Sequence, residues 1–192
     1  MPVGLTPQIA GRTGLWKNQL VEEAEANQSG PHALLNMLNA AGCPHELISH
    51  PHTDTALAEA EAVGVDAFHV AKTIILTTPE GLVRAVLPAS QRLDLHKVRE
   101  LLDTNHVEFA TEEMLANAYP EFELGAVPPF GGSRGDRVLV EGRLCLSPFV
   151  VVDAGTHDQS LRMRTGDLVA LTDALLADLC EDPRPRQETA SL

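Results

Sequence analysis

Aromatic side chains, basic side chains and long apolar runs are all scarce in this sequence. Phe, Trp and Tyr make up 4% of its 192 residues. No window approaches the roughly 18 consecutive apolar residues that a membrane span needs. The first residues also lack a basic segment followed by an apolar run, so we expect neither a membrane segment nor a signal peptide. The hydrophobic content of 44% is ordinary, and the length suits one domain with a real core.

The balance of charge is strongly acidic. Asp and Glu number 27 against 14 Lys and Arg, which gives a formal net charge of −13 at pH 7. Such a surface repels the phosphate backbone, whereas tight binding over many phosphates requires clustered basic residues. We therefore expect no DNA binding. Any contact with RNA is expected to be local, short or assisted by a partner protein.

The three cysteines, Cys43, Cys145 and Cys180, are odd in number and widely spaced, with no C-x-x-C pair. This spacing argues against a disulfide framework and against a zinc ribbon. Free thiols are typical of a reducing compartment, so the cytoplasm is the expected location. We expect all three to be small core residues.

Hydrophobic periodicity and turn residues predict helices interleaved with strands. Helices are expected at residues 15–27, 31–41, 54–63, 94–102, 111–119 and 167–179, and strands at 46–50, 70–77, 82–87, 107–110, 138–140, 143–147, 149–152 and 161–164. A proline–glycine turn at residues 78–81 joins two strands, and a two-residue turn at 141–142 predicts another hairpin. This mixture predicts an α+β fold with a mixed sheet.

Domain organisation follows from the distribution of periodic segments. Residues 1–14 carry scattered Gly, Pro and Thr without periodicity, and the end of the chain is polar. We divide the chain into an N-terminal arm and helix (1–30), one domain (31–181) and a tail (182–192) that is expected to be disordered. No internal repeat is found.

Residues 125–135, Gly-Ala-Val-Pro-Pro-Phe-Gly-Gly-Ser-Arg-Gly, form the most unusual stretch. Its glycines and adjacent prolines exclude a helix or a central strand. Proline fixes φ and removes a backbone donor, whereas glycine allows φ > 0 and close approach of another molecule to the main chain. The stretch is therefore either a rigid binding loop that presents its own backbone or a stiff surface connection.

Short motifs for hydrolysis, metal binding and nucleotide binding are incomplete or absent. Residues 131–135 fit G-x-S-x-G around Ser133, but that nucleophile elbow needs a strand before the serine and a helix after it. His50, His52 and the pair His157-Asp158 lack the close spacing of metal-ligand motifs, which favours surface histidines. Neither a Walker A sequence nor G-x-G-x-x-G occurs, and we expect no metal and no cofactor.

Two polar positions adjoin buried strands. Lys72 lies near the start of the most hydrophobic strand, in His-Val-Ala-Lys-Thr-Ile-Ile-Leu. Its ammonium either reaches water at the strand end or points into a pocket to meet an acceptor. Asp153 follows another buried strand in Asp-Ala-Gly-Thr-His, which ends at His157 and predicts a polar turn.

Three stretches together resemble the YbaK/EbsC family, the free-standing relatives of the editing domain inserted in bacterial prolyl-tRNA synthetases. They are Val-Ala-Lys-Thr at 70–73, Gly-Ala-Val-Pro-Pro-Phe-Gly at 125–131 and Asp-Ala-Gly-Thr-His at 153–157. The resemblance covers about residues 32–180, and the lysine strand with the Gly-x-x-x-Pro loop is specific as a pair. It implies a mixed, partly barrel-like sheet flanked by helices, and hydrolysis of amino acids from mischarged tRNA in trans.

The resemblance also implies roles for particular residues. Lys72 takes the place of the family's lysine, and Asp153 or His157 takes the place of a substrate-contacting residue near the end of the fold. Loop residues expected to hold the aminoacyl end are Gly125, Pro129, Phe130, Gly131, Gly132 and Ser133. Hydrolysis of an activated ester needs no covalent nucleophile if a water is positioned and the oxyanion is stabilised. The expected partner is the 3′ end of aminoacyl-tRNA, with a synthetase as a further candidate.

Two other functions stay open at this point. The acidic charge favours a non-catalytic ligand-binding or regulatory module on the same fold. A serine hydrolase acting through Ser133 is the weakest reading, because its structural context is wrong. The amino acid that is removed and the oligomeric state do not follow from the sequence.

Overall fold

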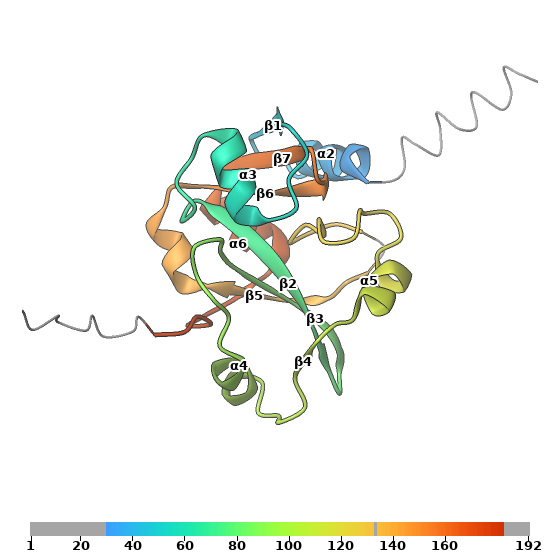
Figure 1. Ribbon diagram of the computed structural model, residues 1–192, viewed down its shortest axis with the longest axis vertical. Helices are drawn as coiled ribbons and strands as arrows, with labels where there is room; N and C mark the ends of the chain where they lie inside the picture. The colour runs from blue at the N-terminus through green and yellow to red at the C-terminus, as the bar shows by residue number, and fades with distance from the viewer. Residues whose placement is uncertain (1–29, 133, 183–192) are drawn as a thin grey trace, which may run out of the picture.

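The computed structural model describes residues 30–132 and 134–182 (Figure 1). Helices are α2 (Pro31–Ala40), α3 (Ala56–Val63), α4 (Leu95–Leu101), α5 (Glu112–Ala118), α6 (Thr165–Thr172) and the 3₁₀ helix η1 (Gly142–Leu146). Strands are β1 (His45–Ser49), β2 (Val70–Thr78), β3 (Gly81–Pro88), β4 (Glu108–Phe109), β5 (Arg137–Glu141), β6 (Phe149–Thr156), β7 (Gln159–Arg164) and β8 (Leu175–Ala177). The helix expected at 15–27 and the tail from 183 lie outside the described residues, so the domain boundaries stay a prediction.

The strands form one mixed sheet in the order β1-β7-β6-β2-β3-β5-β8, and β4 pairs with β2 outside this path. β1, β7 and β6 are antiparallel neighbours, as are β2 and β3. The pairs β6–β2, β3–β5 and β5–β8 are parallel. The predicted α+β fold with a mixed sheet is therefore confirmed, and α3 and α4 lie at opposite ends of the molecule (Figure 1).

Helix ends follow the capping residues. Asp94 accepts hydrogen bonds from the backbone at the start of α4, and Thr111 does the same for α5, both as expected. α3 ends at Gly64, which adopts the left-handed conformation at φ 70°. Its first residue differs from the prediction, because the cap is Thr55 rather than Asp54.

The predicted hairpin at 138–147 is wrong. β5 pairs in parallel with β3 and β8, and residues after it form η1 instead of a return strand. Glu141 is the physical reason, because its buried carboxylate accepts hydrogen bonds from the amides of Arg143, Leu179 and Cys180. One side chain thus caps η1 and ties β5 to residues 179–180.

Two further boundaries differ from the predictions. β6 continues through Asp153 to Thr156 with an irregularity between these two residues, so the expected polar turn begins later. The last helix ends at Thr172, because Asp173 adopts a left-handed conformation and β8 then pairs with β5. Leu161 and Met163 of β7 are buried between exposed arginines, as the alternation predicted.

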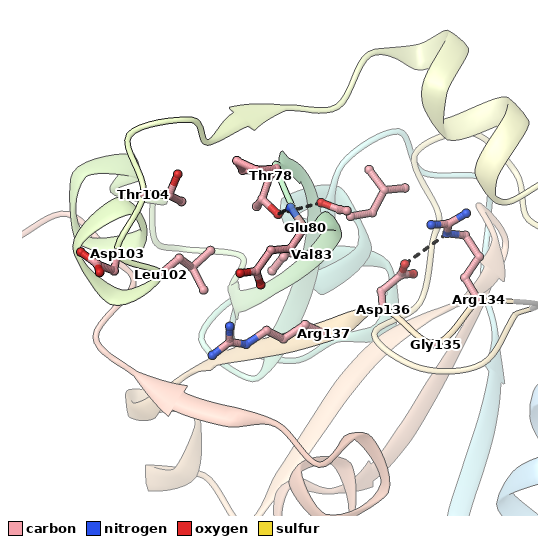
Figure 2. Close-up of a pocket in the computed structure, with 13 residues that line it drawn as sticks. Thr78, Glu80, Val83, Leu102, Asp103, Thr104, Arg134, Gly135, Asp136 and Arg137 are labelled. Carbon is pink, nitrogen blue, oxygen red and sulfur yellow. Dashed lines mark hydrogen bonds and ion pairs between the residues drawn. The ribbon is translucent and has the colours of Figure 1, made fainter.

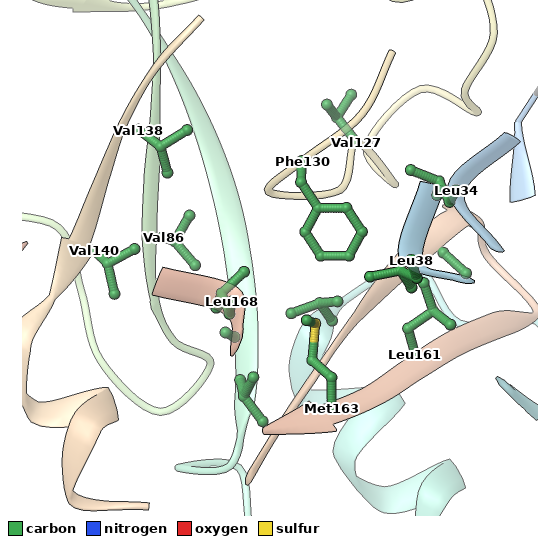
Figure 3. Packing of buried hydrophobic residues seen from close by; sticks show 14 of the residues in the cluster. Leu34, Leu38, Val86, Val127, Phe130, Val138, Val140, Leu161, Met163 and Leu168 are labelled. Carbon is green, nitrogen blue, oxygen red and sulfur yellow. The ribbon is translucent and has the colours of Figure 1, made fainter. Parts of the chain in front are cut away.

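The main core lies between the sheet, α2 and α6. Figure 3 shows the Phe130 ring among Leu34 and Leu38 of α2 and Met163 of β7. The Gly/Pro loop is therefore partly a core element rather than a surface connection. Of the cysteines, Cys180 is buried and Cys43 half-buried, whereas Cys145 is exposed, so the prediction that all three are core residues is wrong.

Candidate active site at the divergence of β2 and β6

The site begins where two parallel strands separate. β2 and β6 pair only over residues 70–71 and 151–152. The next pair in this register would be Lys72 with Asp153, but the ladder stops before it. The same edge of β2 is paired again by β4 at Leu76. Lys72 and Asp153, which are 81 positions apart in the sequence, thus meet at an opening in the sheet.

A cavity of about 240 Å³ lies at this opening. Its wall contains Lys72, Gly125, Asp153 and His157, four of the residues that the sequence predicted for the site. It also contains the carboxyl-bearing Glu59 of α3, which the sequence analysis did not single out. The sequence-distant candidates are therefore brought together, with two further acidic residues, Glu59 and Asp54, in the same wall.

Lys72 is held against backbone rather than against a carboxylate. Its Nζ donates to the carbonyl oxygen of Gln91 at 2.6 Å and to that of Ala89 at 3.3 Å. Burial lowers the pKa of Lys72, because desolvation disfavours the charged form. An ammonium carries three N–H donors, so one of them is left to meet a ligand in the cavity.

His157 is fixed by backbone groups on every side. Its Nδ1 lies 2.9 Å from the carbonyl oxygen of Thr53, and its Nε2 lies 2.9 Å from that of Leu124. Its backbone amide donates to the Glu123 carboxylate at 2.8 Å. Both ring nitrogens therefore face carbonyl oxygens, and the ring shapes the cavity wall.

Asp153 and Glu59 are two carboxyls in one partly desolvated place. Burial raises the pKa of Glu59, although the hydroxyl of Ser160 and the nearby His50 and His157 act in the opposite direction. Burial and the neighbouring Glu59 charge together raise the pKa of Asp153 well above its ordinary value. Among residues 30–132 and 134–182, the Asp153 carboxyl has no side-chain hydrogen-bond partner. The pair therefore retains protons more readily than exposed carboxyls do.

A second cavity of about 210 Å³ adjoins the first. The two share Thr73 and Gly125, and the wall of the second is mainly apolar, with Ile75, Phe109 and Val127. The Thr73 hydroxyl is buried and has no hydrogen-bond partner within the described part of the chain. A buried hydroxyl without a partner is costly, which is typical of groups that meet a ligand. The site thus has a polar half and an apolar half with an unpaired hydroxyl between them.

The Gly/Pro loop is anchored from below by a buried arginine. Arg84 of β3 donates to the carbonyl oxygens of Pro128 and Gly131, each at 2.9 Å. It also donates to Asp136 at 3.2 Å, and the Tyr119 hydroxyl donates to the same carboxylate at 2.7 Å. The Arg84 guanidinium therefore fixes the loop by binding two carbonyl oxygens of the loop backbone.

Only part of the predicted loop reaches the cavities. Gly125, at φ 94°, lines both cavities and lies beside the His157 ring. Phe130 is 5% exposed and packs in the core, and Gly131 packs against Leu34. Pro129, Phe130, Gly131 and Gly132 do not line either cavity, and Ser133 lies outside the described residues. Their contribution to substrate binding stays a prediction.

A separate, larger cavity of about 460 Å³ lies between the β2–β3 turn, the end of α4 and residues 134–137 (Figure 2). Its wall mixes acidic Glu80 and Asp103 with basic Arg134 and Arg137, and Arg134 donates to Asp136 at 3.2 Å. None of the residues expected at the catalytic centre lines it. Among the described residues no cluster of His, Cys, Asp or Glu is arranged to hold a metal ion.

The family model for the aminoacyl-tRNA editing domain matches residues 50–171, a range that includes every residue of the two adjoining cavities. The chain belongs to this family. The resemblance found in the sequence is thereby confirmed. No helix in the described ranges has the length and apolar character that a membrane crossing requires.

Solved structures give the same result for the fold. A structure proposed to be a trans-editing enzyme for prolyl-tRNA synthetase has 27% identity and a TM-score of 0.73, covering 79% of this chain and 97% of its own. A scaffold protein for presenting linear epitopes has 26% identity and a TM-score of 0.73, with coverages of 80% and 97%. A hypothetical protein at 24% identity has a TM-score of 0.71, with coverages of 77% and 99%. The editing-domain chain thus spans nearly the whole length of these structures.

Sequence reasoning missed Glu59, Thr73 and Arg84. Glu59 lies three residues after Ala56 in α3, on the helical stripe that the apolar residues share, which was a usable signal. Arg84 interrupts the otherwise apolar strand β3, which also marked it as unusual. Thr73 belongs to the Val-Ala-Lys-Thr stretch that carried the resemblance, but threonine is ordinary in strands and it was not singled out as a site residue.

Proposed function

We propose that this editing domain hydrolyses the ester bond between an amino acid and the 3′ end of a mischarged tRNA, acting in trans. Family membership supports aminoacyl-tRNA editing in general. The observation that carries the finer proposal is the meeting of Lys72, Asp153 and the backbone of Gly125 in one small polar cavity. The proposed class is therefore a hydrolase acting on a carboxylic ester, with the cytoplasm as its location.

The proposed reaction adds one water across the ester. The water oxygen bonds to the carbonyl carbon, the bond from that carbon to the ribose oxygen breaks, and the ribose oxygen leaves with a proton. The remaining N–H of Lys72 stabilises the negative charge that develops on the carbonyl oxygen. Asp153 contacts the substrate, His157 holds the wall, and Thr73 supplies a hydrogen bond at the entrance to the apolar half.

The size of the site bears on its partner. A cavity of about 240 Å³ is smaller than the roughly 300–1,000 Å³ typical of pockets for larger ligands, so it suits an aminoacyl end rather than a long nucleic-acid segment. With a net charge of −13, we propose weak affinity for tRNA alone. A synthetase that delivers the tRNA is the partner that would offset this.

One observation favours the alternative, a binding module without catalysis. Two of the Lys72 donors are already satisfied by Gln91 and Ala89, as in a purely structural lysine. A salt series separates the two functions. Binding of aminoacyl-tRNA weakens as salt rises, whereas binding of a neutral small ligand does not change.

The direct test is release of amino acids from a panel of correctly charged and mischarged tRNAs, with wild type, Lys72→Met and Lys97→Met. Lys97 is the other lysine of the described ranges. It also donates to a backbone carbonyl, that of Cys180, but it does not line the cavity. We expect wild type to release one amino acid selectively, Lys72→Met to lose about 10²-fold or more in kcat, and Lys97→Met to be unchanged.

Each contrary result has a definite meaning. No release by folded wild type would establish the binding module instead. Release by Lys72→Met at the wild-type rate would remove Lys72 from the reaction, while leaving the hydrolase intact. Circular dichroism of each variant shows that a lost rate is not a lost fold.

A further inference from the structure

A chain of polar contacts leads away from the cavity. The Ser160 hydroxyl of β7 is hydrogen-bonded to the Glu59 carboxyl of α3, and the His50 Nε2 lies 2.8 Å from the same hydroxyl. Ser160 is completely buried, and His50 is half-buried at the outer end of the chain. Glu59 lines the cavity, but Ser160 and His50 do not. The loop after β1, helix α3 and the sequence-distant strand β7 therefore build one path from the cavity wall towards the surface.

The positions of the protons in this chain are restricted. The His50 Nδ1 lies 2.9 Å from the carbonyl oxygen of Pro51, which only accepts, so Nδ1 carries a proton. Ser160 has a single hydroxyl proton. In one arrangement Glu59 is a carboxylic acid that donates to Ser160, and Ser160 donates to Nε2. In the other, Nε2–H donates to Ser160, and Ser160 donates to the Glu59 carboxylate.

We propose that Glu59, Ser160 and His50 form a proton relay between the substrate cavity and solvent. The two arrangements differ by one proton moved along the chain, with the heavy atoms in the same places. Moving it outward converts the Glu59 acid to a carboxylate and the neutral His50 ring to an imidazolium. No bond between heavy atoms forms or breaks.

The relay rests on the proposed function, and it supplies what that function lacks. Hydrolysis of an ester at neutral pH releases one proton, because the carboxylic acid product ionises. Glu59 takes that proton at the cavity wall, Ser160 receives it and gives its own hydroxyl proton to His50 Nε2, and the imidazolium loses one proton to solvent on the side of Nδ1. Proton exchange of the ring with water then restores the proton on Nδ1, opposite the Pro51 carbonyl, and leaves Nε2 able to accept the next one. His157 lacks such a path, because its ring nitrogens face carbonyl oxygens, which have no proton to pass on, whereas His50 faces the Ser160 hydroxyl.

Other charges act on Glu59 from the elements packed around it. His50 and His157 favour the ionised form of Glu59, while the Glu59 charge raises the pKa of Asp153 in β6. Lys72 and Asp54 lie in the same cavity wall. Burial raises the pKa of Glu59, and the Ser160 hydroxyl and the two histidines oppose this rise.

Ser160→Ala interrupts the chain without removing any ionisable group from the cavity. Its matched control is Ser147→Ala, because Ser147 is also buried and its hydroxyl lies 2.7 Å from His69 Nδ1. Ser147 has no carboxyl partner among the described residues. We expect Ser160→Ala and His50→Gln to lower kcat by about 10²-fold with KM unchanged, and to alter the pH dependence of kcat. Ser147→Ala keeps the wild-type profile.

A second measurement needs no activity. The ring ¹⁵N chemical shifts of His50, followed against pH in the full chain, report its protonation directly. Coupling to Glu59 predicts a two-step curve in wild type and a single step in Glu59→Gln. Identical curves would overturn the relay, whether or not the protein deacylates tRNA.

The two proposals fail in different ways. Wild type without deacylase activity removes the proposed function, and the NMR titration still decides whether the three groups exchange a proton. An active wild type in which Ser160→Ala keeps both kcat and its pH profile removes the relay alone. Thermal unfolding of Ser160→Ala and Ser147→Ala shows whether the two deletions cost the fold equally.

Discussion

Two groups of buried polar side chains lie on either side of β2 and are built in opposite ways. Under the Gly/Pro loop, Arg84 and Asp136 form an ion pair at 3.2 Å in which both side chains are 2% exposed. At the cavity, Glu59 and Asp153 place two acidic groups together. The first group combines opposite charges, whereas the second combines like ones.

The partners of each group differ as much as the charges do. Arg84 uses its fork on two backbone carbonyls and one carboxylate, and the Tyr119 ring lies 5.0 Å from its guanidinium carbon. Burial and the hydrogen bond to Asp136 raise the pKa of Tyr119, so the phenol stays neutral. Among the described residues that line the cavity, Lys72 is the only lysine. Its ammonium donates to backbone carbonyl oxygens and not to the carboxylates.

This contrast separates a structural site from a chemical one. A fully satisfied buried network rigidifies the loop that it supports. Glu59 and Asp153 form no ion pair with another described residue, and two desolvated carboxyls of this kind cost stability. Such groups are found at sites where proton transfer is needed. The Arg84 group therefore holds the loop of the site, and we propose that the Glu59 group takes part in its chemistry.

The largest expected effect on stability comes from breaking the Arg84–Asp136 ion pair. Asp136→Asn removes the charge opposite Arg84 and leaves a guanidinium buried without a carboxylate. We expect the free energy of unfolding to fall by about 3 kcal/mol, because breaking a buried ion pair from one side leaves an uncompensated charge. Urea denaturation of the variant and wild type measures the difference.

Asp178→Asn is the control for this substitution. Asp178 pairs with Lys97 and Arg143, but its side chain is 61% exposed, so we expect a loss below about 1 kcal/mol. Equal losses for the two variants would mean that Asp136 is no more important than a surface ion pair. The comparison between the two buried groups would then have no energetic basis.

An Asp-to-Asn substitution at the cavity is expected to raise the free energy of unfolding, whereas Asp136→Asn lowers it. Asp153→Asn replaces a desolvated carboxyl beside Glu59 with a neutral amide of the same shape. We expect the free energy of unfolding at pH 7 to rise by about 1 kcal/mol while deacylation falls, a trade that is common at active sites. The same denaturation series measures the stability, and the tRNA panel measures the rate.

A destabilised Asp153→Asn protein would contradict the contrast directly. It would show that the carboxylate has a favourable partner in the folded protein. An unchanged deacylation rate in a stabilised variant would keep the energetic argument, but it would move substrate contact from Asp153 to another cavity residue.

Local chemistry accounts for the parts of the fold that the sequence predicted. The capping residues Asp94 and Thr111, the turn at residues 78–81 and the alternation of β7 each depend on neighbours a few residues away. η1 could not be predicted in this way. It forms because Glu141 bonds to amides near residue 180, a contact that sequence spacing does not reveal.

The site was predictable to the extent that single residues carried a signal. Lys72 stood out in an apolar strand, and Gly125 in a Gly/Pro loop. Their meeting with Asp153 depends on the parallel pairing of β2 with β6, which joins segments about 80 residues apart by sequence numbering. Glu59 was missed because a glutamate on a short alanine-rich helix is normally exposed.

The smallest expected effect concerns the pH dependence of stability. Glu59 and Asp153 have raised pKa values in the folded protein, so between their ordinary values of 4.5 and 3.8 and their folded values the native state binds more protons than the unfolded state. Stability therefore falls as pH rises through that window, by at most about 1.4 kcal/mol per pH unit for each proton. The double variant Glu59→Gln/Asp153→Asn loses this slope. Denaturation from pH 4 to 8 measures it.

The difference between the stability–pH curves of wild type and of the double variant isolates the contribution of Glu59 and Asp153. The hydrogen bond from Lys97 lowers the pKa of Asp178, which gives stability that is lost only as pH falls, and this contribution is the same in wild type and in the double variant. Parallel curves would show that neither carboxyl holds a proton more tightly in the folded state. The relay would then have no acid to start from, whereas the Arg84 network would still fix the loop.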